Sequence, residues 1–142
     1  MSVKAILNEK GGDVFSMSPD ATLSDVVKEL AARKIGAVLI TEGDHLAGIL
    51  SERDVVRVVA KAGPAALDAA ASSVMTAKVE TCGLDDMIDD VMERMTASRF
   101  RHMPVVEGGR VIGVISIGDV VKQRIEEAVR ERDNMREYIH SI

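Results

Sequence analysis

The sequence contains the same segment twice, with Asp54 and Asp119 at equivalent positions 65 residues apart. Residues 48–56 read GILSERDVV and residues 113–121 read GVISIGDVV, and the match runs back without a gap to Asp25 and Asp90. A duplicated unit too small to bury its own apolar face must pack on its copy, and the seam between copies is a natural ligand cleft. The duplication therefore predicts two similar repeats that share one core.

The composition favours one compact domain with an aliphatic core. A chain of 142 residues falls in the commonest size range for a single domain. Hydrophobic residues make up 46% of the chain but aromatic residues only 2%, so any bound base must lie between aliphatic side chains. Two Phe, one Tyr and a net charge of −5 argue against a nucleic-acid partner, which needs stacking platforms and positive charge.

The sequence predicts a soluble protein of a reducing compartment. Cys82 is the single cysteine, so no internal disulfide can form, and we expect it to serve as a small buried hydrophobe. The N-terminus lacks an apolar run with a cleavage-like site, and no segment approaches the ~20 apolar residues that cross a bilayer. We therefore predict a cytoplasmic location and no membrane partner.

Each copy predicts the same order of elements: a short extended piece, an amphipathic helix, two strands and a second helix. Apolar residues recur at helical spacing from Leu23 to Leu30 and from Ile88 to Met95. The strand-like runs flank Gly-containing hairpin turns. They are 37–40 and 46–50 around the turn at 42–44, and 103–106 and 111–115 around the turn at 107–109.

The connecting and terminal segments complete the predicted organisation. Gly63-Pro64 breaks a helix ahead of an alanine-rich run. After Asp119 a helical pattern continues to the end of the chain without Pro or Gly, and we expect this helix to pack on the body or on a second subunit. We assign a first repeat to residues 1–62, a linker to 63–73, a second repeat to 74–130 and a helical tail to 131–142.

Two serine–aspartate pairs, Ser51 with Asp54 and Ser116 with Asp119, stand where a strand turns into a helix. One interpretation is a capping box, in which the hydroxyl accepts from the amide three residues on and the acidic side chain reaches back. The other is a binding site, because a helix N-terminus presents free amides to a phosphate and a nearby Asp can accept two hydrogen bonds from a ribose diol. The two roles are compatible.

A basic cluster lies beside the second pair of strands. Arg99, Arg101 and His102 precede a predicted core strand, and Arg101 near a helix N-terminus could grip a phosphate. The first copy has Gly36 at the matching position, with Arg53 among its nearest cations. We therefore expect the two clefts to differ in charge.

The paired Gly-x-x-Ser-x-x-Asp segments resemble those of tandem cystathionine-beta-synthase (CBS) domains, a pair known as a Bateman module. The resemblance covers nearly the whole chain and also rests on Val74-Met75-Thr76 and on the run RHMPVV at 101–106. It implies an α/β (α+β) fold of two βαββα repeats packed about a pseudo-twofold axis as one module, here with an extended C-terminal helix.

The resemblance also implies a regulatory ligand, an adenosine compound such as AMP, ADP, ATP, NAD or S-adenosylmethionine, and no catalytic cofactor. Carried over by position, Asp54 and Asp119 would hold ribose hydroxyls, Ser51 and Ser116 would approach phosphates, and Arg101 would neutralise them. The other residues expected at the clefts are Val14, Ser16, Ile35, Gly36, Ala37, Arg53, Val79, Thr81 and His102.

Modules of this family commonly pair into a disc-like dimer, so the resemblance implies a homodimer that reports ligand occupancy to an unidentified target protein. The sequence shows no metal-ligand spacing, nucleophile elbow or P-loop, and we predict no enzymatic activity and no metal. The alternative, from a different class, is a structural or dimerisation module with empty clefts, in which the serines and aspartates only cap helices.

Overall fold

The computed structural model describes residues 1–141 and divides them into two compact units. Unit 1 comprises Met1–Gly12, Thr81–Gly108 and the chain from Ile112 onward, and unit 2 comprises Asp13–Glu80 and Gly109–Val111. The last residue of the predicted tail, Ile142, lies outside the described residues. The repeat boundaries assigned from the sequence stay a prediction, because repeats and compact units are different divisions of the chain.

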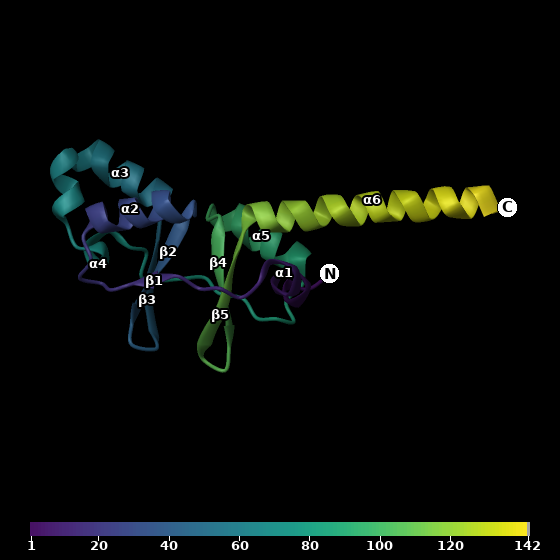
Figure 1. Cartoon of the computed structure of the whole chain (residues 1–142), viewed down its shortest axis with the longest axis horizontal. Coiled ribbons are helices and arrows are strands. Elements are labelled where there is room, and N and C mark those ends of the chain that lie inside the picture. Colours follow the sequence, from purple (N-terminus) through teal and green to yellow (C-terminus); the bar gives the residue numbers. More distant parts are fainter. Residues whose placement is uncertain (142) are drawn as a thin grey trace. The chain divides into compact units, whose positions relative to one another are not determined.

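Unit 2 packs helices against a three-stranded sheet (Figure 1). Its elements are β1 (Ser16–Met17), α2 (Leu23–Arg33), β2 (Ala37–Glu42), β3 (His45–Ser51), α3 (Glu52–Ala62), η1 (Pro64–Asp68) and α4 (Ala71–Val74). β1 runs parallel to β2, and β2 pairs antiparallel with β3. The apolar stripe of α2, formed by Leu23, Val26 and Leu30, is buried against Ile40 and Leu50 of the sheet, which removes it from water and fixes the helix on the strands.

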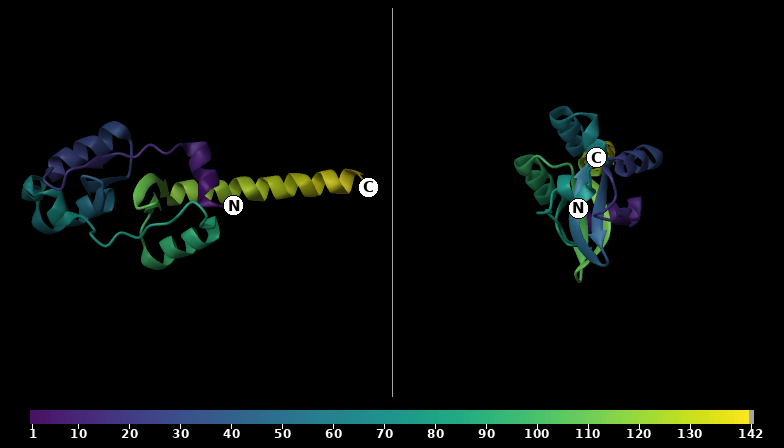
Figure 2. Two further views of the ribbon diagram at one scale, coloured as in Figure 1. Left: turned by 90° about the horizontal axis from the view of Figure 1, so that it is seen from below. Right: turned by 90° about the vertical axis from the view of Figure 1, so that its left-hand side faces the viewer.

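Unit 1 contains α5 (Ile88–Ser98), β4 (His102–Glu107), most of β5 (Arg110–Ser116) and α6 (Ile117–Ser141), together with α1 (Val3–Lys10) from the N-terminus. Figure 2 shows α1 and α5 on either side of the first turns of α6. The far end of α6 projects beyond the rest of this unit (Figure 1), and its residues from 128 to 141 are exposed.

The two units match at the 65-residue spacing found in the sequence. α2 and α5 are each 11 residues long with equivalent ends, and the strands of the two hairpins have identical burial patterns. Even the short first strand has its counterpart, since Met17 pairs with Ile40 and Cys82 with Val105, both in parallel. The predicted α/β class, the element order of each repeat and the long C-terminal helix are confirmed.

Each unit is completed by a helix that precedes the other repeat in the chain. In unit 2 the Ala71 N–H at the start of α4 donates to the Ala21 carbonyl at 2.7 Å. In unit 1 the Val3 N–H at the start of α1 donates to the Asp86 carbonyl at 2.9 Å. Asp86 is the residue equivalent to Ala21 at the 65-residue spacing, so α1 serves unit 1 in the way that α4 serves unit 2.

The lone thiol is part of the core of unit 1. Cys82 is 5% exposed and packs in the cluster that includes Val105 and Ile115. Burial raises the pKa of Cys82 to about 11, the charge of Asp86 adds to this shift, and Arg94 opposes it. The thiolate is therefore scarce at neutral pH, which agrees with the expected role of a small buried hydrophobe.

Glycine is required where another segment packs closely against the second strand of each hairpin. The segment is residues 75–76 at β3 and α1 at β5. A Cβ built on Gly48 in β3 would lie 2.5 Å from Met75 Sδ and 2.9 Å from the Thr76 carbonyl oxygen. The equivalent Gly113 in β5 would place a Cβ 2.7 Å from Leu7 Cδ2 of α1. All three distances are shorter than real Cβ atoms show, so a side chain at either glycine would require the neighbouring atoms to shift, and at Gly48 these include backbone.

We predict that Gly48→Ala lowers the free energy of unfolding by about 1–3 kcal/mol, because the added methyl group overpacks a contact that includes backbone. Urea denaturation monitored by circular dichroism measures this change. The matched control is Gly83→Ala, where nothing lies within 4 Å of the added Cβ, and it should shift stability by less than about 0.5 kcal/mol. Equal stability of the two variants would contradict the proposed packing requirement.

Candidate functional site

Both serine–aspartate pairs form capping boxes, at the first turns of α3 and α6. The Ser51 N–H donates to Asp54 Oδ2 at 2.9 Å, and the Asp54 N–H donates to Ser51 Oγ at 3.3 Å. The Ser116 N–H donates to Asp119 Oδ2 at 2.8 Å, and the Asp119 N–H donates to Ser116 Oγ at 3.2 Å. These bonds satisfy amides that a helix start leaves without partners, so the capping interpretation holds for both pairs.

The same device starts α2, which is outside the predicted binding residues. The Asp25 N–H donates to Thr22 Oγ1 at 3.1 Å, and the Thr22 N–H donates to Asp25 Oδ2 at 3.4 Å. A capping box in this chain is therefore a general way to begin a helix. A binding role for Asp54 and Asp119 must rest on their surroundings.

Those surroundings differ in charge between the two units. Asp119 Oδ2 lies 2.6 Å from the Lys10 Nζ of α1, and Lys10 also donates to the Val114 carbonyl at 2.7 Å. Asp54 Oδ1 has Arg57 Nη1 at 4.0 Å, on a side chain that is 71% exposed. The expected charge difference thus arises largely from α1, which reasoning from the sequence had not included in the site.

The ion pair with Lys10 changes the acidity of the Asp119 carboxyl. Burial alone would raise its pKa, but hydrogen bonds from Lys10 and Ser116 and the Lys10 charge together lower the pKa below the ordinary value of 3.8. The carboxylate is therefore ionised throughout the physiological range. Its side chain remains 25% exposed, and that of Asp54 19%.

In unit 2, the run Ile35-Gly36-Ala37 reaches the start of α3. The Gly36 carbonyl accepts from the Glu52 N–H at 3.0 Å, which places this run beside the capping box of Asp54. The remaining expected residues of the unit lie elsewhere on it. Val14 and Ser16 are exposed at or before β1, Arg53 is exposed on the first turn of α3, and Val79 is half-buried near the end of the unit.

Unit 1 repeats this contact with Arg101 in place of Gly36. The Arg101 carbonyl accepts from the Ile117 N–H at 2.8 Å, so Arg101 lies beside the first turn of α6 with its side chain exposed. His102 begins β4 and is half-buried. The Thr81 carbonyl accepts from Arg94 Nη2 at 2.8 Å, so its backbone binds α5.

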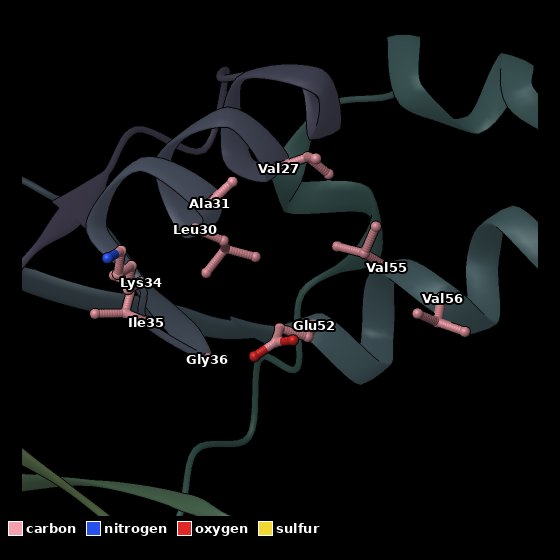
Figure 3. A pocket seen from close by; sticks show the side chains of 9 residues that line it. All are labelled: Val27, Leu30, Ala31, Lys34, Ile35, Gly36, Glu52, Val55 and Val56. Atoms are coloured by element: carbon pink, nitrogen blue, oxygen red, sulfur yellow. The ribbon is translucent and has the colours of Figure 1, made fainter.

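A pocket of about 440 Å³ opens between α2 and α3 in unit 2. Figure 3 shows Leu30 of α2 and Val55 of α3 pointing toward one another across it. Its lining is mainly aliphatic and consists of Val27, Leu30, Ala31, Lys34, Ile35, Gly36, Glu52, Val55 and Val56. Of the expected cleft residues it includes Ile35 and Gly36. The volume is within the range of small-molecule pockets, and Val56 of its lining is 67% exposed.

Two features are absent from the part of the chain that the structure describes, residues 1–141. No group of three or more His, Cys, Asp or Glu side chains there is arranged to hold a metal ion. Nor does any helix of that range have the length and hydropathy that a membrane crossing demands.

The chain matches the sequence model of the CBS domain twice, over residues 3–61 and 71–126. With the repeated fold and the paired Ser–Asp helix starts, this match places the protein in the CBS domain family, as a tandem pair.

Known proteins support the same assignment. A mitochondrial CBS domain-containing protein of Arabidopsis thaliana is 30% identical over 147 residues, which cover 97% of this chain and 71% of that protein. The crystal structure of a CBS-domain containing protein from Agrobacterium tumefaciens is 46% identical, with a TM-score of 0.86 over 87% of this chain and 99% of that one. A CBS domain protein from Pyrobaculum aerophilum, complexed with AMP, is 28% identical, with a TM-score of 0.74 over 84% of this chain and 89% of that one.

We predict that Asp119→Asn lowers the free energy of unfolding at pH 7 by roughly 0.5–1.5 kcal/mol, through loss of the charge at a helix start and of the Lys10 ion pair. Because the folded-state pKa of Asp119 is depressed, this stabilisation is complete above pH 3.8 and is lost as the pH falls through the folded-state pKa. Urea titrations from pH 7 to pH 3 should therefore show the two proteins converging in stability. The control, Asp44→Asn in an exposed turn, should match the wild type at every pH. A gap that stays constant with pH would contradict the assignment.

Proposed function

We propose that the protein is a regulatory module that binds an adenosine nucleotide and reports its occupancy to another protein, with no turnover of the ligand. The observation that carries the proposal is that each repeat begins its last helix with a partly exposed carboxylate beside a serine. It gains support from membership of the CBS family and from the AMP complex of the relative that is 28% identical.

Capping and ribose binding use different oxygens of each aspartate. In both boxes the hydrogen bonds from the chain's own groups go to Oδ2: from the Ser51 amide and hydroxyl in Asp54, and from the Ser116 amide and Lys10 in Asp119. Oδ1 of Asp54 has the exposed Arg57 Nη1 at 4.0 Å. A carboxylate offers about four acceptor positions. Oδ1 of each therefore provides acceptors for a ribose diol while the capping box stays in place.

The remaining ligand groups are matched by the residues around each helix start. The positive dipole ends at the N-termini of α3 and α6 favour a phosphate, and the exposed Arg53 and Arg101 supply cations near them. The buried side chains of both units are mainly aliphatic, and side chains of this kind supply apolar contacts for the adenine base. AMP is the ligand that we choose for the test, since it is the one in the Pyrobaculum complex; ADP, ATP and NAD share its adenosine part.

We expect AMP to raise the melting temperature, and Asp54→Ala and Asp119→Ala each to weaken AMP binding at their own site by roughly 1–3 kcal/mol through lost hydrogen bonds to the diol. Isothermal titration calorimetry measures both effects. Asp25→Ala is the matched control, because it removes the same kind of capping box from α2 and should lower stability without changing AMP affinity.

One observation favours the structural alternative, in which the serines and aspartates only cap helices. The Thr22–Asp25 box shows that the chain uses this motif where no ligand is expected. If AMP, ADP, ATP, NAD and S-adenosylmethionine all left the melting temperature unchanged, this alternative would replace the nucleotide-binding proposal.

We further propose a homodimer built through α6. One side of this helix carries an exposed apolar stripe, formed by Val121, Ile125 and Ile139, which are 43%, 59% and 64% exposed. An exposed stripe of this kind marks a protein–protein contact. The helix continues to Ser141, whereas the family match ends at residue 126. Residues 130–137 carry three Arg and three acidic side chains, so the same helix of a second copy offers opposite charges to both signs.

We predict that Ile125→Glu converts the dimer to a monomer, because a charge in the stripe cannot be buried against a second copy. Light scattering during size-exclusion chromatography should show the mass of one chain in place of two. Asn134→Glu adds the same charge on the opposite side of α6, about 180° around the helix, and should remain dimeric. A wild-type protein that is monomeric at all concentrations would refute the dimer.

The cytoplasmic location stays a prediction, as does the absence of nucleic-acid and membrane partners. The Arabidopsis relative is named as mitochondrial, so related chains work in more than one compartment if our prediction is right. Expression of a fluorescent fusion in the native cell would test it.

A further inference from the structure

We propose that Lys10 is the specificity-determining residue of the Asp119 site, where its ammonium group selects a phosphate-bearing adenosine ligand over the uncharged nucleoside. This inference rests on the proposed nucleotide-binding function. It concerns a residue that lies in α1, 109 positions from Asp119 in the sequence, and that forms no part of the Gly-x-x-Ser-x-x-Asp segments.

The ammonium group of Lys10 is held at the start of α6 by two acceptors. Nζ lies 2.6 Å from Asp119 Oδ2 and 2.7 Å from the Val114 carbonyl oxygen, and the side chain is 40% exposed. An ammonium has three N–H donors. With two of them directed at the protein, the third and the positive charge are available to an anion that approaches Asp119 from solvent.

Attachment of α1 to unit 1 does not depend on Lys10. Val3 and Ile6 of α1 are 0% and 2% exposed in the core. The neighbouring Glu9 accepts from Gln123 Nε2 at 2.5 Å and pairs with Lys122 Nζ at 3.5 Å. These contacts dock the end of α1 on α6, so the helix that carries Lys10 is held beside Asp119 without the ion pair.

Comparison of the units shows that a charged donor is not needed at the Val114 carbonyl. The equivalent carbonyl in unit 2, that of Ile49, accepts from the Thr76 backbone N–H at 2.9 Å. Unit 1 instead brings a lysine side chain to this carbonyl. The two arrangements therefore differ in charge. The lysine of unit 1 neutralises Asp119, whereas the backbone amide of unit 2 carries no charge.

Neutralisation of Asp119 bears directly on a phosphate ligand. An unpaired carboxylate that binds the ribose would repel the phosphate a few ångströms away, and the effect is larger at a partly buried site than in water. Lys10 removes this repulsion and adds an attraction. At Asp54 the nearest cation given by the structure is 4.0 Å away and largely exposed, so the preference for phosphate should be stronger at Asp119.

The test compares AMP with adenosine by isothermal titration calorimetry, in the full-length protein carrying Asp54→Ala so that the Asp119 site is observed alone. We expect Lys10→Met, which keeps the length of the side chain and removes its charge, to weaken AMP binding about tenfold and to change adenosine binding less than about twofold. Lys10→Arg should restore most of the AMP affinity. Lys4→Met removes the same charge from an exposed position of α1 and should change neither affinity.

The outcomes separate this inference from the function on which it rests. Unchanged AMP binding in Lys10→Met, or an equal loss of AMP and adenosine affinity, would overturn the selectivity role and leave the nucleotide-binding proposal intact. Failure of the wild-type protein to bind either compound would overturn both. Should Lys10→Met fail to fold by circular dichroism, Lys10→Gln takes its place under the same expectations.

Discussion

The fold of unit 1 depends on the packing of α1 against elements that lie more than 70 residues further along the chain. The hydrogen bond from the Val3 amide to the Asp86 carbonyl attaches α1 to a unit whose other elements begin after residue 80, and its counterpart from Ala71 to Ala21 attaches α4 to the start of α2 within unit 2. Apolar burial of Val3 and Ile6 makes this attachment stable. Because α1 is fixed in this way, Lys10 reaches Asp119, and the electrostatics of the candidate site follow from the packing of the core.

In the function that we propose, one motif serves structure and ligand together. Ser51–Asp54 and Ser116–Asp119 cap α3 and α6 through Oδ2, as Thr22–Asp25 caps α2. A carboxylate that is held by its own backbone is pre-organised, so a ligand that uses the other oxygen loses little side-chain entropy on binding. A rigid acceptor at the start of each last helix is thus a by-product of helix capping that a duplicated nucleotide-binding module can use.

Much of the fold could be predicted because it depends on patterns among residues that are close in the sequence. The spacing of Leu23, Val26 and Leu30 defined α2, and the Gly-containing turns defined both hairpins, since period and turn chemistry are properties of neighbouring residues. The helical conformation of residues 3–10 was not predicted, because this short segment is held mainly by contacts with residues 84–88 and with α6. The pocket between α2 and α3 was predicted only in part, since lining residues such as Val27 and Val56 come from two helices that only tertiary packing brings together.

By itself, the sequence determined the duplication, the aliphatic core, the order of elements in each repeat and the four residues of the two capping boxes. These depend on composition and on spacings of a few residues, which the backbone geometry of helices and hairpins converts directly into structure. Only the tertiary structure decided which helix completes each unit and that Lys10 Nζ lies 2.6 Å from Asp119 whereas Arg57 Nη1 lies 4.0 Å from Asp54. The helix attachments and the Lys10 ion pair join residues between 50 and 109 positions apart, and they arise because burial of apolar surface, which is non-directional, selects the partners that fit.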